Sequence, residues 1–264
     1  MYKSFILPLF YYCCHLWDNC TKEQAQSLEN LHLDALRTIC GAVRGTSHEK
    51  LYAETNQKPL IKRREESKLV LFYKMVNDIA PSYLCNLLPN NVSDKSNYNL
   101  RNRDKFQTIR CKSNNYFNSF LPSTIRLWNN LPENITNANT VGQFRRLITS
   151  SYINKIFDLN FGSRFCQIIH WRLRLGCSDL NGDLYERFVS ETSSCLCAYP
   201  FEDAFHYFFV CPRYHDIRND LYFYKNGCTL TDVLFGNDTV SKETNMHILR
   251  SVHEYIVQSK RFHL

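Results

Sequence analysis

Residues 193–218 read SSCLCAYPFEDAFHYFFVCPRYHDIR and carry the most specific chemical pattern of the chain. Within them the spacing C-x-C-x8-H-x4-C is formed by Cys195, Cys197, His206 and Cys211. Three thiolates and one imidazole are a common tetrahedral ligand set for Zn²⁺, and four protein ligands leave no open position for catalysis. The pattern therefore predicts a structural zinc knuckle, which would contribute folding free energy to this part of the chain.

The sequence leaves two other interpretations of these residues open. Cys195 and Cys197 are also compatible with a pair of buried thiols beside an unrelated histidine. His215, four residues after Cys211, is an alternative to His206 as the nitrogen ligand.

Length and charge set broad limits on the protein. The 264 residues allow one large domain or two small ones, and 44% of them are hydrophobic, which is ample for a packed core. The formal net charge of +7 mildly favours an anionic partner such as RNA or DNA.

The cysteines and the amino-terminal residues bear on the compartment. Lys3 and the apolar run after it resemble a signal peptide, but Pro8 interrupts the run and no small-x-small cleavage site follows. No stretch reaches the roughly 18 apolar residues of a membrane span. We therefore expect an intracellular protein of the cytoplasm or nucleus, away from membranes, with its twelve cysteines reduced or metal-bound. A secreted disulfide protein is the alternative.

Hydrophobic periodicity predicts a mainly α fold with little strand. Thr21 and Gln24 form a capping-box pattern ahead of a helix that is expected to reach Arg44, with Gly45 after its end. Further helices are expected at 59–78, 121–132, 140–148, 164–175, 230–235 and 241–261. Their inward faces include Leu69, Phe72, Tyr73, Val76, Ile125, Trp128, Phe144, Ile248, Leu249, Val252 and Ile256.

We expect two helical segments joined by a linker. Residues 1–89 form the first segment, residues 90–163 an irregular linker with short helices, and residues 164–264 a helical carboxy-terminal domain stapled by the knuckle. Lys62, Arg63, Arg64 and Lys68 are expected on a solvated face, offset by nearby glutamates.

Basic and aromatic residues are interleaved in residues 90–120, which include Arg101 and Arg103. Such interleaving suits a nucleic-acid strand, because phosphates take the positive charge and bases stack on rings. An irregular connector whose aromatic side chains pack on the core is the equal alternative. Arg145 and Arg146 are expected on the polar side of a later helix, and they join Arg101 and Arg103 as candidate contacts with nucleic acid.

Catalytic motifs are missing from the sequence. It contains no Asp-Asp pair after a hydrophobic strand, no phosphate-binding glycine loop, no Gly-x-Ser-x-Gly and no His-Glu-x-x-His. We therefore expect neither an enzyme nor a small-molecule substrate.

Four stretches in order resemble the carboxy-terminal part of the reverse transcriptase polyprotein of non-LTR (LINE-type, jockey-like) retrotransposons. They are LPLFYYCCHLWDNCTKEQAQSLENLHLDALRTICGA, KPLIKRREESKLVLFYKMVNDIAPSYLCNLLP, NYNLRNRDKF with SFLPSTIRLWNNLPENI, and CLCAYPFEDAFHYFFVCPRYHDIRNDL. The first resembles the thumb that follows the polymerase palm, and the last resembles the Cys/His knuckle of the family. Ala198 stands where the family commonly has a glycine, which is expected to strain the turn and leave the ligands in place.

The resemblance implies a role in target-primed reverse transcription, with RNA, DNA and the polymerase palm as partners. It implies Cys195, Cys197, His206 and Cys211 as zinc ligands. Arg172 and Arg174 would contact phosphates and Trp171 would be a stacking platform, although a core position is the alternative for Trp171. The endonuclease and the palm with its catalytic Asp pair are not in the sequence. We therefore expect a truncated element that does not polymerise.

Overall fold

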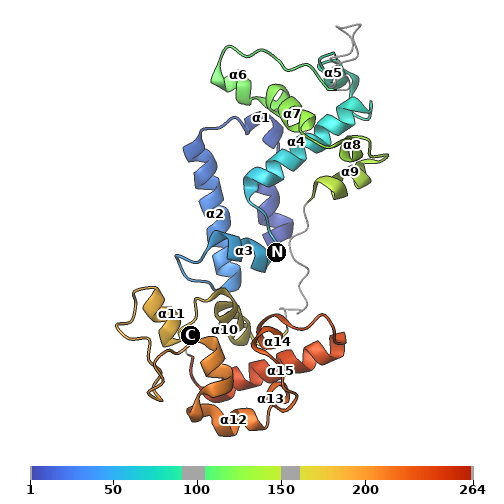
Figure 1. The fold of residues 1–264 in the computed structure, drawn as a ribbon. Helices are drawn as coiled ribbons and strands as arrows, with labels where there is room; N and C mark the ends of the chain where they lie inside the picture. The colour runs from blue at the N-terminus through green and yellow to red at the C-terminus, as the bar shows by residue number, and fades with distance from the viewer. Residues whose placement is uncertain (1, 91–104, 150–160, 263–264) are drawn as a thin grey trace. The chain divides into compact units, whose positions relative to one another are not determined.

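The computed structural model describes residues 2–90, 105–149 and 161–262 (Figure 1). Every regular element within these ranges is a helix, and they hold no strand. The prediction of a mainly α fold is therefore confirmed. None of the helices in these ranges is long and apolar enough to cross a bilayer.

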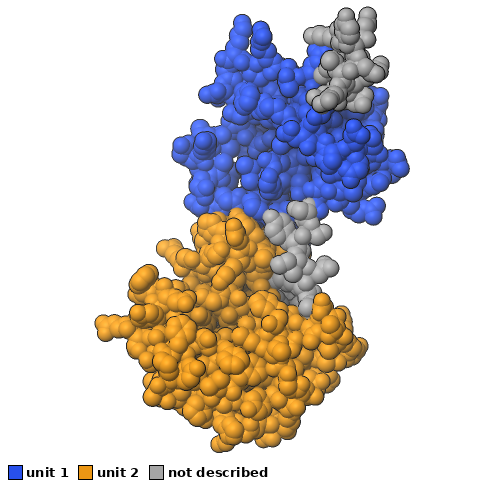
Figure 2. All heavy atoms as spheres, viewed as in Figure 1, with its two compact units in different colours: residues 1–32, 58–151 blue, residues 33–57, 152–264 orange. Residues whose placement is uncertain are grey.

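The chain forms two compact units, which Figure 2 shows in different colours. The first unit combines residues 1–32 with residues 58–151, and the second combines residues 33–57 with residues 152–264. Residues 33–57 thus pack with the carboxy-terminal part of the chain.

The first unit contains two long helices, one of them only in part, and several short ones. Helix α2 begins in this unit and ends in the second. In chain order the elements are η1 (Tyr2–Ile6), η2 (Leu7–Phe10), α1 (Cys14–Trp17), α2 (Lys22–Cys40), α4 (Leu60–Val76), α5 (Ser82–Cys85), α6 (Asn114–Asn118), α7 (Phe120–Asn129), α8 (Glu133–Thr136) and α9 (Val141–Ile148).

Helix α4 packs against α7 and α9 to make the core of the first unit. Phe72 and Trp128 lie with ring centroids 5.1 Å apart, and the rings of Tyr73 and Phe144 stack at 4.5 Å. The hydroxyl of Tyr73 donates to the carbonyl of Ala138 at 2.6 Å, which satisfies its polar atom inside the core. The predicted inward residues that are buried are Leu69, Phe72, Tyr73, Ile125, Trp128 and Phe144, whereas Leu147, also expected to face inward on α9, is 42% exposed.

The basic side of α4 differs from the prediction. Arg64 and Lys68 are 3% and 6% exposed, and both form ion pairs with Asp18, which follows α1. The Nε of Arg64 lies 2.6 Å from the Asp18 carboxylate. This part of the face is therefore buried and paired, because α1 covers it.

The second unit holds the carboxy-terminal helices and the end of α2. Its elements are α3 (His48–Thr55), α10 (Arg164–Leu175), α11 (Asn181–Glu186), η4 (His206–Val210), η5 (Pro212–Tyr214), α12 (His215–Asn219), α13 (Tyr222–Lys225), α14 (Leu230–Phe235) and α15 (Lys242–Ser259). Helix α15 packs on α10, α12, α13 and α14, so it is the centre of this unit. Its predicted inward residues are all buried: Ile248, Leu249, Val252 and Ile256.

Helix α2 begins as predicted and ends earlier. The Thr21 hydroxyl accepts from the Gln24 amide while the Gln24 side chain accepts from the Thr21 amide, which completes the capping box. The helix stops at Cys40 because Gly41 adopts a left-handed φ of 65°. A Cβ on Gly41 would lie 2.6 Å from the side chain of Ile168, so only glycine fits this contact. Gly41, rather than Gly45, therefore ends the helix.

Candidate metal centre

The first two cysteines lie in a tight turn. The amide of Ala198 donates to the carbonyl of Cys195 at 2.9 Å, and the amide of Cys195 donates to the carbonyl of Tyr199 at 2.9 Å. Ala198 has φ of 69°, a left-handed conformation that glycine adopts more readily. The turn lets two thiols at positions two apart face the same point, and the expected strain at Ala198 is present.

His206 and Cys211 are brought together by a π-helical turn, η4. The amide of Cys211 donates to the carbonyl of His206 at 2.8 Å, an i→i+5 hydrogen bond. Asp203 fixes the start of this turn, since its carboxylate accepts from the amide of His206 at 2.7 Å. The spacing H-x4-C thus corresponds to one π turn.

The four side chains converge on one point. Their ligand atoms all lie within 4.8 Å of one another, which is close enough to hold a metal ion. The Sγ atoms of Cys195 and Cys211 are 3.8 Å apart, too far for a disulfide bond of about 2.05 Å. The Sγ of Cys197 lies 3.3 Å from Nε2 of His206. His206 is therefore the histidine of the cluster.

His215 lies outside this cluster. It is exposed, and its Nε2 lies 3.0 Å from the side-chain amide of Asn219. The ring of His206 instead stacks on Tyr199, with centroids 4.3 Å apart.

Burial is the main influence on the pKa values of three of the four side chains, Cys195, His206 and Cys211. It raises the pKa of the Cys195 thiol to about 12 and raises the pKa of Cys211 above its usual range. Burial also lowers the pKa of His206, so its imidazole is neutral at neutral pH. A neutral imidazole is ready to bind a metal ion, whereas the ion must displace protons from the buried thiols.

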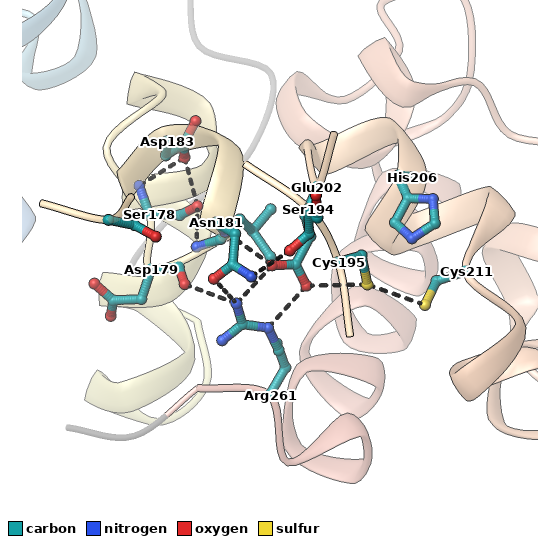
Figure 3. A network of polar contacts seen from close by, with 12 residues as sticks. Ser178, Asp179, Asn181, Asp183, Ser194, Cys195, Glu202, His206, Cys211 and Arg261 are labelled. Atoms are coloured by element: carbon teal, nitrogen blue, oxygen red, sulfur yellow. Dashed lines mark hydrogen bonds and ion pairs between the residues drawn. The ribbon is translucent and has the colours of Figure 1, made fainter. Parts of the chain in front are cut away.

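An ion pair between buried Glu202 and half-buried Arg261 lies beside the cysteine turn (Figure 3). Glu202 is 2% exposed, and its carboxylate accepts from Nη2 of Arg261 at 2.7 Å and from the amide of Asn181 at 2.8 Å. Its other oxygen lies 3.6 Å from the Sγ of Cys195. Burial favours the neutral acid, but the bonds from Arg261 outweigh it and lower the pKa of Glu202. This ion pair could not be found from the sequence, because Arg261 lies 59 residues away from Glu202.

Arg172, Arg174 and Trp171 are held within the second unit. Arg174 is 5% exposed at its side chain and forms an ion pair with buried Glu54 at 2.7 Å. Arg172 donates to the carbonyl of Gly41 at 2.8 Å and forms an ion pair with the carboxylate of Asp179, which follows α10. A charge held in a buried ion pair is not offered to a phosphate, and this placement argues against Arg174 as a phosphate contact.

Trp171 is 7% exposed, so its ring packs in the core. A ring that is covered in this way has no free face for a base, and the core alternative describes Trp171.

Arg145 and Arg146 are exposed on α9, where they are free to meet a polyanion. Arg101 and Arg103 lie outside the described residues. Among the described candidates for nucleic-acid contact, Arg145 and Arg146 are the two that are exposed.

Comparison of the chain with protein-family models, with curated proteins and with solved structures finds no match. The resemblance to retrotransposon polyproteins thus stays a prediction from the sequence.

Proposed function

We propose that Cys195, Cys197, His206 and Cys211 bind one structural Zn²⁺. We further propose that the chain is a non-catalytic, nucleic-acid-binding fragment of a non-LTR retrotransposon reverse transcriptase.

The observation that carries the zinc proposal is the spacing of the ligand atoms. Two thiolates about 2.3 Å from a tetrahedral ion lie about 3.8 Å apart, and a thiolate and an imidazole nitrogen lie about 3.5 Å apart. The corresponding separations here are 3.8 Å for Cys195 and Cys211 and 3.3 Å for Cys197 and His206. Soft thiolate ligands with one imidazole favour Zn²⁺ over Mg²⁺ or Ca²⁺.

A structural role follows from the ligand set and from burial. Four protein ligands complete a tetrahedral shell, and three of the four residues are buried. The ion would tie the turn at Cys195 to η4, which packs into the aromatic core of the second unit through Tyr207 and Phe208.

Support for nucleic-acid binding comes from the first unit. Between residues 105 and 149 the only acidic residue is Glu133, whereas the basic residues are Lys105, Arg110, Lys112, Arg126, Arg145 and Arg146. Tyr116 and Phe117 are 48% and 46% exposed, and the guanidinium of Arg126 lies 3.6 Å from the centroid of the Phe117 ring. Exposed rings next to cations suit the bases and phosphates of a single strand.

Fluorescence anisotropy with labelled single-stranded RNA and DNA tests this binding. The logarithm of the affinity should fall linearly with the logarithm of salt, by about 0.7 for each neutralised phosphate. The double variant Arg145→Gln/Arg146→Gln should reduce this slope. A matched control removes two exposed lysines elsewhere, Lys22→Gln/Lys242→Gln, and should retain the slope. Affinity that does not change with salt, or no binding, contradicts the proposal.

A second candidate is a protein-interaction fragment. Exposed apolar residues are concentrated near the amino terminus: Phe5 at 72%, Leu9 at 73%, Tyr12 at 75% and Leu16 at 82%. Apolar groups exposed this closely along a chain are typical of an interface with another protein. Self-association without affinity for nucleic acid would favour this candidate.

A further inference from the structure

Arg218, on α12, is a fully buried cation without a carboxylate partner. It is 2% exposed, and its Nη2 donates to the carbonyl of Cys211 at 2.7 Å. Its Nε and Nη1 make no hydrogen bond of good geometry among the described residues, although the neutral hydroxyl of Tyr255 lies beside the guanidinium. The guanidinium lies 5.7 Å from the centroid of the Tyr224 ring, a neutral group.

The other buried cations of the described chain are paired. Arg64 and Lys68 share the carboxylate of Asp18. Arg218 forms no ion pair in the ranges that the structure describes, although a guanidinium stays protonated in proteins. An unpaired charge is costly to bury, so a nearby anion is to be expected.

A zinc-bound centre would supply that anion. One Zn²⁺ with three thiolates and a neutral imidazole carries a net charge of −1, since +2 and −3 sum to −1. The carboxylate of Glu202 is already compensated by Arg261. The charge of the centre therefore remains to be balanced, and Arg218 contacts the main chain of one of its ligands.

We infer that Arg218 is the counter-cation of the metal centre, a positioning residue that stabilises the zinc-bound state by its charge and by its hydrogen bond to Cys211. This inference rests on the proposed zinc site. If the inference holds, the zinc ion and Arg218 stabilise each other. With zinc bound, the negative charge of the centre balances the buried guanidinium of Arg218. Without zinc, that guanidinium is a buried charge with no counter-charge.

A thermodynamic cycle tests this dependence in the full chain. Zn²⁺ affinity is measured by competition with a zinc-binding dye, and the urea midpoint is measured with zinc and with excess chelator. Arg218→Met, which keeps an unbranched side chain without charge, should weaken zinc binding about 10–100-fold. In the chelated protein the same change should leave the urea midpoint unchanged or raise it, because it removes an unpaired charge.

Two further variants separate charge from packing. Arg218→Lys keeps the charge and should bind zinc within about tenfold of the parent, as expected if charge is the main contribution. Arg64→Met removes a buried cation of the first unit and should lower stability alike with and without zinc, with zinc affinity unchanged.

The outcomes distinguish the two proposals. A parent protein that binds no zinc overturns the zinc site, and the inference with it. A parent that binds zinc while Arg218→Met binds it equally well, or loses the same stability with and without zinc, overturns the inference alone. If Arg218→Met does not fold, Arg218→Lys decides: loss of zinc affinity by more than about tenfold would show that charge is not what Arg218 contributes.

Discussion

The amide of Cys211 donates to the carbonyl of His206 at 2.8 Å, which closes a π turn between two of the four candidate ligands. A π turn is rare and is frequently found at functional sites. Here it places a thiol and an imidazole five residues apart beside each other, on the segment that also buries Tyr207 and Phe208. The candidate metal centre and the core of the second unit are thus formed by the same few residues.

Ala198→Gly should stabilise the protein by about 1 kcal/mol, because Ala198 is held at a left-handed φ of 69°. Chemical denaturation in the presence of zinc measures the change. The same substitution inside a regular helix, Ala25→Gly in α2, should destabilise by about 1 kcal/mol. Destabilisation by both variants would show that the turn carries no strain.

Gly182→Ala should destabilise the protein by about 1–3 kcal/mol. A Cβ at Gly182 would lie 2.7 Å from the carbonyl oxygen of Glu202 and 2.9 Å from the Phe201 ring, so α11 would be pushed away from the knuckle, residues 193–218. Gly142→Ala is the matched control in α9. Its Cβ meets only the Thr140 hydroxyl, at 4.0 Å, and should stabilise by up to about 1 kcal/mol. Urea denaturation of both variants makes the comparison, and equal effects would contradict this account of Gly182.

Glu54→Gln should cost about 3–5 kcal/mol, since it leaves the guanidinium of Arg174 buried without its carboxylate. The double variant Glu54→Gln/Arg174→Met should recover most of this loss in urea denaturation, because no charge stays buried. The exposed pair of Lys225 and Asp220 is the control, and Asp220→Asn should change stability by less than about 1 kcal/mol. A double variant as unstable as Glu54→Gln would contradict the buried ion pair.

Stability should fall in acid because of two buried histidines, His170 and His253, whose rings lie 5.7 Å apart. Burial lowers the pKa of His253 to about 4 and lowers the pKa of His170. Both are neutral when folded and gain a proton on unfolding below pH about 6.5. The free energy of unfolding is therefore highest above that pH and falls toward pH 4, by up to about 1.4 kcal/mol per pH unit for each histidine.

Denaturation across this pH range, with chelator present to exclude metal release, measures the effect. His253→Leu should flatten the profile, whereas His247→Gln, at an exposed position, should not. An unchanged slope in His253→Leu would contradict the assignment.

Local patterns in the sequence predicted the helices and the cluster of Cys and His side chains. The capping box at Thr21 and the buried face of α15 follow from spacing within a few turns, where neighbours in sequence are neighbours in space. The spacing of the Cys and His residues predicted the cluster for the same reason. The resemblance to the retrotransposon knuckle, in which a glycine is common at this position, predicted the left-handed conformation of Ala198.

Pairings between distant residues could not be predicted in this way. Arg174 and Glu54 are 120 residues apart, and Arg261 and Glu202 are 59 apart. Nothing in the local pattern of an arginine separates one that meets a buried carboxylate from one that faces a phosphate. The buried partners of the arginines on α10 therefore could not be predicted from the sequence.

The central claim, a single structural zinc ion, is tested most directly by the metal content of the purified protein. Elemental analysis should find about one Zn²⁺ per chain, near zero in Cys197→Ser, and the parent value in Cys228→Ser, whose thiol lies outside the cluster. Zinc at the parent level in Cys197→Ser, or no zinc in a folded parent protein, would contradict the account.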